Sequence, residues 1–224
     1  IQEVVFGIVW AQATGATSLP QFASVGKLKV ADATLQNAFD AQFALPQPPP
    51  AVDLMATGLD QEVILEWGSS TGDLGDIFNY DVENPFVPVD ATDRTYTFEG
   101  FRIYQFRGDA DTDGVLIGAY DLNNGITTIT DVLVDPATGA ALTTVVANGS
   151  DNAGDVRTPT TFRITNSAFD QQKLRNGTRY TFGVQAYAYN EASIGTRVFL
   201  GPMARVSVQP SKVGPVAPVT TAGT

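Results

Sequence analysis

The chain of 224 residues contains neither cysteine nor histidine. Without cysteine there is no thiol nucleophile and no disulfide. Without either residue, the usual zinc ligands and every histidine-based catalytic triad are excluded. Catalysis would have to rest on a pair of carboxylates, for which Glu66, Glu83 and Glu99 are available. Because nothing in their spacing places two of them across a cleft, the sequence favours a protein that is not an enzyme.

Basic residues are also scarce, with 13 Lys and Arg against 24 Asp and Glu and a net charge of −11. This balance argues against nucleic acid or an anionic membrane as a partner. No stretch is long and apolar enough to cross a membrane. The run VVFGIVWAQA has a small-residue pattern like the end of a signal peptide. Glu3 and the lack of a basic region favour an ordered strand over Val4 to Gln12 instead.

The stretch from Leu174 to Asn190 carries the strongest signal for a fold. After a polar turn, apolar residues stand at every second position from Tyr180 to Ala188. Period-two alternation predicts a β-strand with one face in a core. The leucine, the turn and the tyrosine also have the spacing of a tyrosine corner, in which the tyrosine hydroxyl hydrogen-bonds to upstream backbone.

Together with Trp67 and the segment FEGFRIYQF at 98–106, this strand resembles fibronectin type III domains of large secreted and cell-surface bacterial proteins. In those proteins a tryptophan-containing segment and a helix with a Pro-rich exit often precede the domain, and residues 8–50 resemble that arrangement. The resemblance implies an immunoglobulin-like sandwich with Trp67, Leu174 and Tyr180 as its signature residues. It also implies an extracellular spacer or assembly module without catalysis.

The expected fold is therefore an all-β, fibronectin type III-like sandwich with enlarged loops, preceded by a strand and one α-helix. The expected parts are an N-terminal extension at 1–45, a Pro-rich linker at 46–50, the sandwich at 51–209 and an extended tail at 210–224. Two insertions, 68–97 and 137–159, exceed ordinary loop length. The first, rich in aromatics and proline, predicts a packed excursion, and the second predicts a small hairpin around 142–146.

Alternation and turn residues predict the strands of the sandwich. They fall at 51–58, 62–67, 98–106, 115–120, 126–134, 161–165 and 199–209. A helix is predicted to begin with Ser24 as its N-cap and to end before Pro46. Apolar residues at helical spacing, including Leu28, Leu35 and Phe39, predict that this helix packs against the sandwich.

The apolar first strand suggests assembly. Val4, Phe6, Ile8 and Trp10 share one face, and the other face is also apolar, so both need cover. Such a strand can pair within its own domain or complete the sheet of a neighbour by strand addition. The favoured hypothesis is a secreted structural protein at the cell surface, a subunit of a filament or layer whose partners are copies of itself.

Two alternatives remain open. The chain can be an adhesion module that binds glycans or surface proteins through its long loops, which exposed rings of Phe78, Tyr80 and Phe86 would support. It can also be an accessory domain of a larger secreted protein. Of two Asn-Gly-Ser/Thr sequences, Asn148 in the second insertion is the candidate glycosylation site. At Asn176 the preference of Asn-Gly for tight turns suffices.

The loop from Asp109 to Gly114 has the D-x-D-x-D-G opening of an EF-hand. Asp109, Asp111 and Asp113 are therefore candidate ligands for an optional Ca²⁺, because alternate carboxylates on a tight turn can converge on one hard cation. Tyr120 stands where the closing acid is expected, so a plain acidic turn between strands is the alternative. The same loop contains the integrin tripeptide at 107–109, a pattern too short to carry weight.

Overall fold

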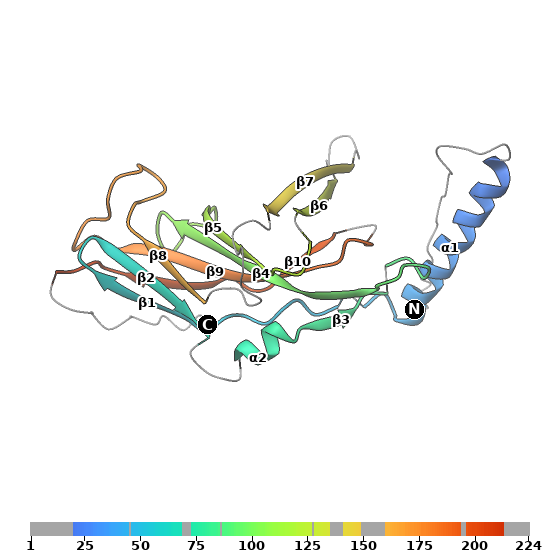
Figure 1. Ribbon diagram of the computed structural model, residues 1–224, viewed down its shortest axis with the longest axis horizontal. Coiled ribbons are helices and arrows are strands. Elements are labelled where there is room, and N and C mark those ends of the chain that lie inside the picture. Colours follow the sequence, from blue (N-terminus) through green and yellow to red (C-terminus); the bar gives the residue numbers. More distant parts are fainter. Residues whose placement is uncertain are drawn as a thin grey trace, which may run out of the picture.

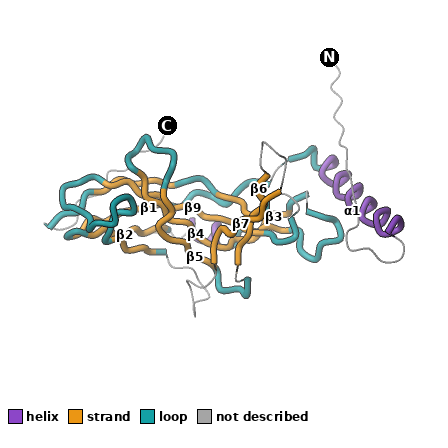
Figure 2. The backbone as a smooth tube through the Cα atoms, turned by 90° about the horizontal axis from the view of Figure 1, so that it is seen from above, coloured by secondary structure: helices purple, strands orange, loops and turns teal. Residues whose placement is uncertain are grey.

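The computed structural model describes residues 20–44, 46–68, 73–85, 87–126, 128–134, 141–148, 160–193 and 196–212. These form antiparallel sheets with one long N-terminal helix (Figures 1 and 2). The elements are α1 (Pro20–Asp40), β1 (Leu54–Leu59), β2 (Glu62–Trp67), α2 (Asp73–Phe78), β3 (Asp81–Glu83), β4 (Thr95–Phe106), β5 (Val115–Asp121), β6 (Thr128–Val134), β7 (Ala141–Asn148), β8 (Thr161–Ile164), β9 (Tyr180–Tyr189), β10 (Val198–Leu200) and β11 (Ala204–Val208).

Two antiparallel sheets carry the main core. One has three strands in the order β1-β2-β8, and the other is built on the central pair β4 and β9, with β3 and β5 beside β4 and β10 and β11 beside β9. Side chains from both sheets meet in the core, where the Trp67 ring lies edge-on to Phe101 with 5.4 Å between ring centroids. Trp67 is 2 % exposed. The structure is mostly β, with antiparallel sheets and one N-terminal helix, and to that extent the predicted fold class is confirmed.

The predicted hydrogen bond of Tyr180 is present at the start of β9. The Arg175 backbone N–H donates to the Tyr180 hydroxyl oxygen at 2.9 Å. Leu174, directly before that turn, is completely buried, and its own N–H donates to the carbonyl of Thr165 at 2.9 Å. The leucine anchors the turn in the core, and the tyrosine closes it from outside.

The hairpin of β6 and β7 contacts one end of the outer face of β9. Ile129 of β6 packs with Tyr187, Tyr189 and Val198 in a second buried cluster. At this end both faces of β9 are therefore buried, although its sequence alternates. The strand predicted at 126–134 and the hairpin predicted around 142–146 are thus one hairpin, in which Thr130 lies opposite Val145.

The first insertion is a packed excursion, as predicted. It contains α2 and β3, and both Ile77 and Val87 are completely buried in the main core. β3 pairs with the first residues of β4. The insertion therefore extends the larger sheet instead of forming a free loop.

Two predictions of local structure are wrong. α1 begins at Pro20, so Ser24 lies inside the helix and is not its N-cap; proline is well tolerated in the first turn, because its missing N–H has no helical partner there. The strand predicted at 199–209 is divided into β10 and β11. The division falls at Gly201, where an added Cβ would lie 2.6 Å from the Pro49 carbonyl oxygen.

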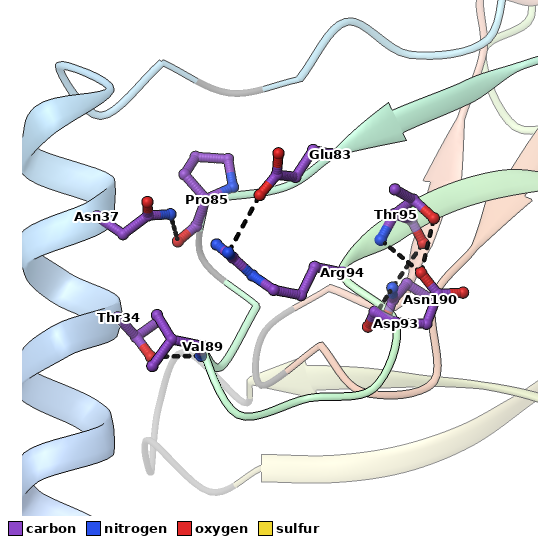
Figure 3. A network of polar contacts seen from close by, with 9 residues as sticks. All are labelled: Thr34, Asn37, Glu83, Pro85, Val89, Asp93, Arg94, Thr95 and Asn190. Atoms are coloured by element: carbon purple, nitrogen blue, oxygen red, sulfur yellow. Dashed lines mark hydrogen bonds and ion pairs between the residues drawn. The ribbon is translucent and has the colours of Figure 1, made fainter.

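The apolar stripe of α1 does not pack on the sheets as predicted, since Leu28 and Phe39 are 42 % and 48 % exposed. The helix is held by polar contacts to the loop after β3 (Figure 3). Asn37 Nδ2 donates to the Pro85 carbonyl at 3.3 Å, and the Val89 N–H donates to Thr34 Oγ1 at 3.1 Å. α1 therefore lies at one end of the long axis, beyond β3 (Figure 1).

Candidate assembly surface

A groove of about 370 Å³ separates β5, at the border of the larger sheet, from β8, at the border of the smaller one. In the described part of the chain, β5 pairs only with β4 and β8 only with β2. The lining residues are Val115, Leu116, Ile117, Phe162, Arg163, Ile164, Thr165, Asn166, Ser167, Ala168 and Gln171. Val115 and Leu116 are 39 % and 41 % exposed. The groove thus combines apolar side chains with two strand borders.

The two borders converge at one end of this groove. The Phe162 ring lies over Gly118, where an added Cβ would meet the ring at 2.6 Å. The Tyr120 hydroxyl donates to the Thr161 carbonyl at 2.9 Å. These contacts join β5 to β8 at one end of the groove, and the exposed Val115 and Leu116 lie toward its other end.

The opposite border of the sandwich is closed by backbone hydrogen bonds. The Ser211 N–H donates to the Leu59 carbonyl of β1 at 3.1 Å, and the Gly177 N–H donates to the Pro210 carbonyl at 2.9 Å. Gly58 lies so near this segment that an added Cβ would stand 2.4 Å from the Gln209 carbonyl oxygen. The residues after β11 therefore cover the free side of β1.

The predicted calcium ligands do not converge. Among the described residues, no group of three or more acidic side chains is placed to hold a metal ion. Asp111 turns inward on its own loop, accepting hydrogen bonds from the N–H groups of Arg107 and Asp113 at 2.9 and 3.0 Å. The alternate carboxylates stabilise an acidic turn, which the sequence left open as the other interpretation.

Asp109 instead fastens this turn to the larger sheet. Its carboxylate accepts hydrogen bonds from Ser207 Oγ at 2.5 Å and Thr181 Oγ1 at 2.8 Å, and forms an ion pair with Arg179 at 2.7 Å. The two hydroxyl contacts, together with nearby arginines, lower the pKa of Asp109. With its carboxylate engaged and the Arg107 guanidinium stacked 4.3 Å from the Phe169 ring centre, the integrin tripeptide is a structural turn.

A buried acidic cluster that the sequence analysis did not predict lies on the outer face of β4. Phe98 lies opposite Ala188 and Gly100 opposite Tyr187, so Glu99 between them is the extra residue of a β-bulge. Glu99 is completely buried and Asp121 is 1 % exposed. The one available signal was an acid placed between an aromatic residue and a glycine in a strand.

The partners of this cluster come from β5, β9 and the turn after β5. Asn124 Nδ2 donates to both Glu99 carboxyl oxygens at 3.0 Å, and the Tyr187 hydroxyl donates to Asp121 Oδ1 at 2.8 Å. Burial, followed by the nearby Asp121 charge, raises the pKa of Glu99 to about 8. Glu99 therefore holds its proton at neutral pH, and its burial keeps that proton from any substrate. Glu83 is paired with Arg94 at 3.1 Å, and Glu66 is exposed on β2.

The rings expected to bind a glycan are largely enclosed. Tyr80 is 8 % exposed, and its hydroxyl donates to the Gln47 carbonyl at 2.6 Å. Phe78 packs edge-on against Phe98 with 5.2 Å between centroids. Phe86 lies outside the described residues. The adhesion hypothesis thus loses the contact rings that motivated it at Phe78 and Tyr80.

Several predicted residues are not placed by the structure. Val4, Phe6, Ile8 and Trp10 lie outside the described ranges, as does the tail from 213 onward. Asn148 is the last residue of β7, where its backbone lies opposite Thr128. Asn176 does form a turn contact, since its Oδ1 accepts from the Gln61 N–H at 2.9 Å and its Nδ2 donates to Asp60 at 2.7 Å.

No known protein family, curated protein or solved structure matches this chain. In the described ranges, no helix has the length and apolarity needed to cross a membrane.

Proposed function

We propose that this protein is a non-enzymatic, extracellular structural subunit that assembles with copies of itself into a surface filament or layer. The observation that supports the proposal is the groove between β5 and β8, which presents apolar side chains beside two strand borders. Natural proteins usually cover or charge such borders, because an open one invites pairing with another chain. The contact proposed here is strand addition by a terminal segment.

We further propose that the sandwich is a fibronectin type III domain with enlarged loops. Its support is the combination of a three-stranded sheet of β1, β2 and β8 with a larger sheet in which β5, β4, β9 and β11 are neighbours. The hydroxyl contact of Tyr180 and the buried Trp67 agree with it. Domains of this kind commonly serve as extracellular modules, which is the basis for the proposed location.

Negative-stain electron microscopy with light scattering tests assembly. The unmodified chain is expected to form regular fibres or sheets. The double variant Phe6→Asp with Ile8→Asp should remain monomeric, because it puts two charges on the apolar face of the first strand. Gln2→Asp with Gln12→Asp adds the same two charges just beyond the ends of residues 4–10 and should still assemble. The proposal is contradicted if the unmodified chain stays monomeric under all conditions. It is also contradicted if both double variants reduce assembly equally.

A further inference from the structure

We propose that the groove between β5 and β8 accepts residues 4–10 of a second copy of this chain. This inference rests on the proposed function and adds to it the accepting border and the donor segment. The donor reads VVFGIVW and contains no charged residue. An added strand gains backbone hydrogen bonds from the border and places alternate side chains in an apolar pocket.

The geometry of β8 supplies the backbone partner. The Trp67 N–H donates to the Thr160 carbonyl at 3.0 Å, so the backbone of Thr160 points toward β2. Backbone direction alternates along an antiparallel strand, so Thr161 and Arg163 point away from β2 and toward the groove. The hydrogen bond from the Tyr120 hydroxyl to the Thr161 carbonyl agrees with this direction. Arg163 thus turns its N–H and carbonyl toward an incoming strand.

The lining offers the donor apolar side chains beside polar groups. Val115 and Leu116 come from β5 and Phe162 from β8, while the chain from Thr165 to Gln171 adds polar side chains. The volume of about 370 Å³ lies within the range of pockets that bind small molecules. The fastened end at Gly118 limits how far a strand can enter, which sets its register. At the opposite border the Leu59 carbonyl is already engaged by the Ser211 N–H.

A second copy is the favoured source of the donor. The donor precedes α1, and α1 lies at one end of the long axis, while β2 and β5 lie toward the other (Figures 1 and 2). The nine residues between Trp10 and Pro20 span at most about 35 Å when fully extended. Donor and acceptor on different parts of the surface make a head-to-tail contact, which propagates into a fibre when it does not close into a ring.

Disulfide trapping tests the contact, and the chain suits it because it has no cysteine of its own. Two single donor variants, Phe6→Cys and Ile8→Cys, are each mixed with the acceptor variant Leu116→Cys under mild oxidation. An affinity tag on the acceptor alone distinguishes mixed dimers from like pairs on a non-reducing gel. Gln209→Cys, exposed after β11 at the covered border, is the matched control acceptor.

At least one donor should give about tenfold more mixed dimer with Leu116→Cys than with Gln209→Cys. Equal yields overturn the inference. A variant that carries both a donor and an acceptor cysteine is also informative. If its disulfide forms only within one chain, the inference is overturned. If fibres form but neither donor reacts with Leu116→Cys, this groove is not the acceptor and the proposed function stands. If the unmodified chain does not assemble, the proposed function fails together with this inference.

Discussion

Replacing Glu99 by glutamine should change how the stability of this protein depends on pH. Glu99 is completely buried beside Asp121, and its pKa is raised to about 8. In the unfolded chain its pKa returns to about 4.5. Below that value both states hold the proton, and Glu99 adds no pH dependence. From there to about pH 8 the folded protein keeps a proton that the unfolded chain releases, so stability falls as pH rises.

The size of this loss follows from the interval between the two pKa values of Glu99. One pKa unit corresponds to about 1.4 kcal/mol. The interval from 4.5 to about 8 thus predicts a loss on the order of 5 kcal/mol across that range. Such a loss is comparable to the whole stability of many small domains. Glutamine has nearly the same shape and no proton to release. The stability of Glu99→Gln relative to that of the unmodified protein should therefore rise steadily from pH 4.5 to 8.

Urea unfolding at several pH values measures this difference, with the fluorescence of buried Trp67 as the signal. The informative quantity is the change with pH in the free energy gap between variant and unmodified protein, because a fixed packing cost of glutamine cancels from it. Glu66→Gln, at an exposed position on β2, is the control and should give a constant gap. A constant gap for Glu99→Gln as well would refute the argument that Glu99 is folded in its protonated form.

Four further substitutions test local contacts. Tyr180→Phe should cost about 1 kcal/mol in thermal or urea unfolding, because it removes the acceptor of the Arg175 N–H. Gly100→Ala should cost more than about 3 kcal/mol, since its Cβ would stand 1.9 Å from a backbone oxygen. Gly75→Ala, in open space on α2, should instead stabilise by up to about 1 kcal/mol. Asp109→Asn should weaken the turn near neutral pH and reduce the loss of stability on acidification, as its lowered pKa in the folded state requires; unfolding followed from pH 6 to pH 2 measures both.

The sequence predicted those parts of the fold that depend on local chemistry. The spacing from Leu174 to Tyr180 predicted the contact of the Tyr180 hydroxyl with upstream backbone, because a tight turn brings residues five apart together. Period-two alternation located β2 and β9, because successive side chains of a strand point to opposite faces. Long-range pairings were not predictable in this way. Nothing local in β6 indicates that it pairs with β7 or that Ile129 covers Tyr187.

The candidate sites show the same limit. The spacing of Asp109, Asp111 and Asp113 is as compatible with a turn as with a cation site, and the choice depends on hydroxyls that β9 and β11 bring to Asp109. An apolar helical stripe predicts a packed helix, but α1 meets the loop after β3 through Thr34 and Asn37. Both outcomes depend on residues distant in the sequence. Residue type and spacing alone do not contain that information.

The insertions of this chain can be understood as covers for the sandwich. The hairpin of β6 and β7 covers Tyr187 and Tyr189 at one end of β9, and the first insertion extends the larger sheet through β3. The segment after β11 occupies the free side of β1. Against this background the groove between β5 and β8 stands out among the described borders, because its apolar side chains are left in contact with solvent. Because the net charge of −11 repels like copies at long range, the proposed assembly depends on a specific short-range contact at this groove. Screening that charge with salt should therefore accelerate assembly without changing the residues that crosslink.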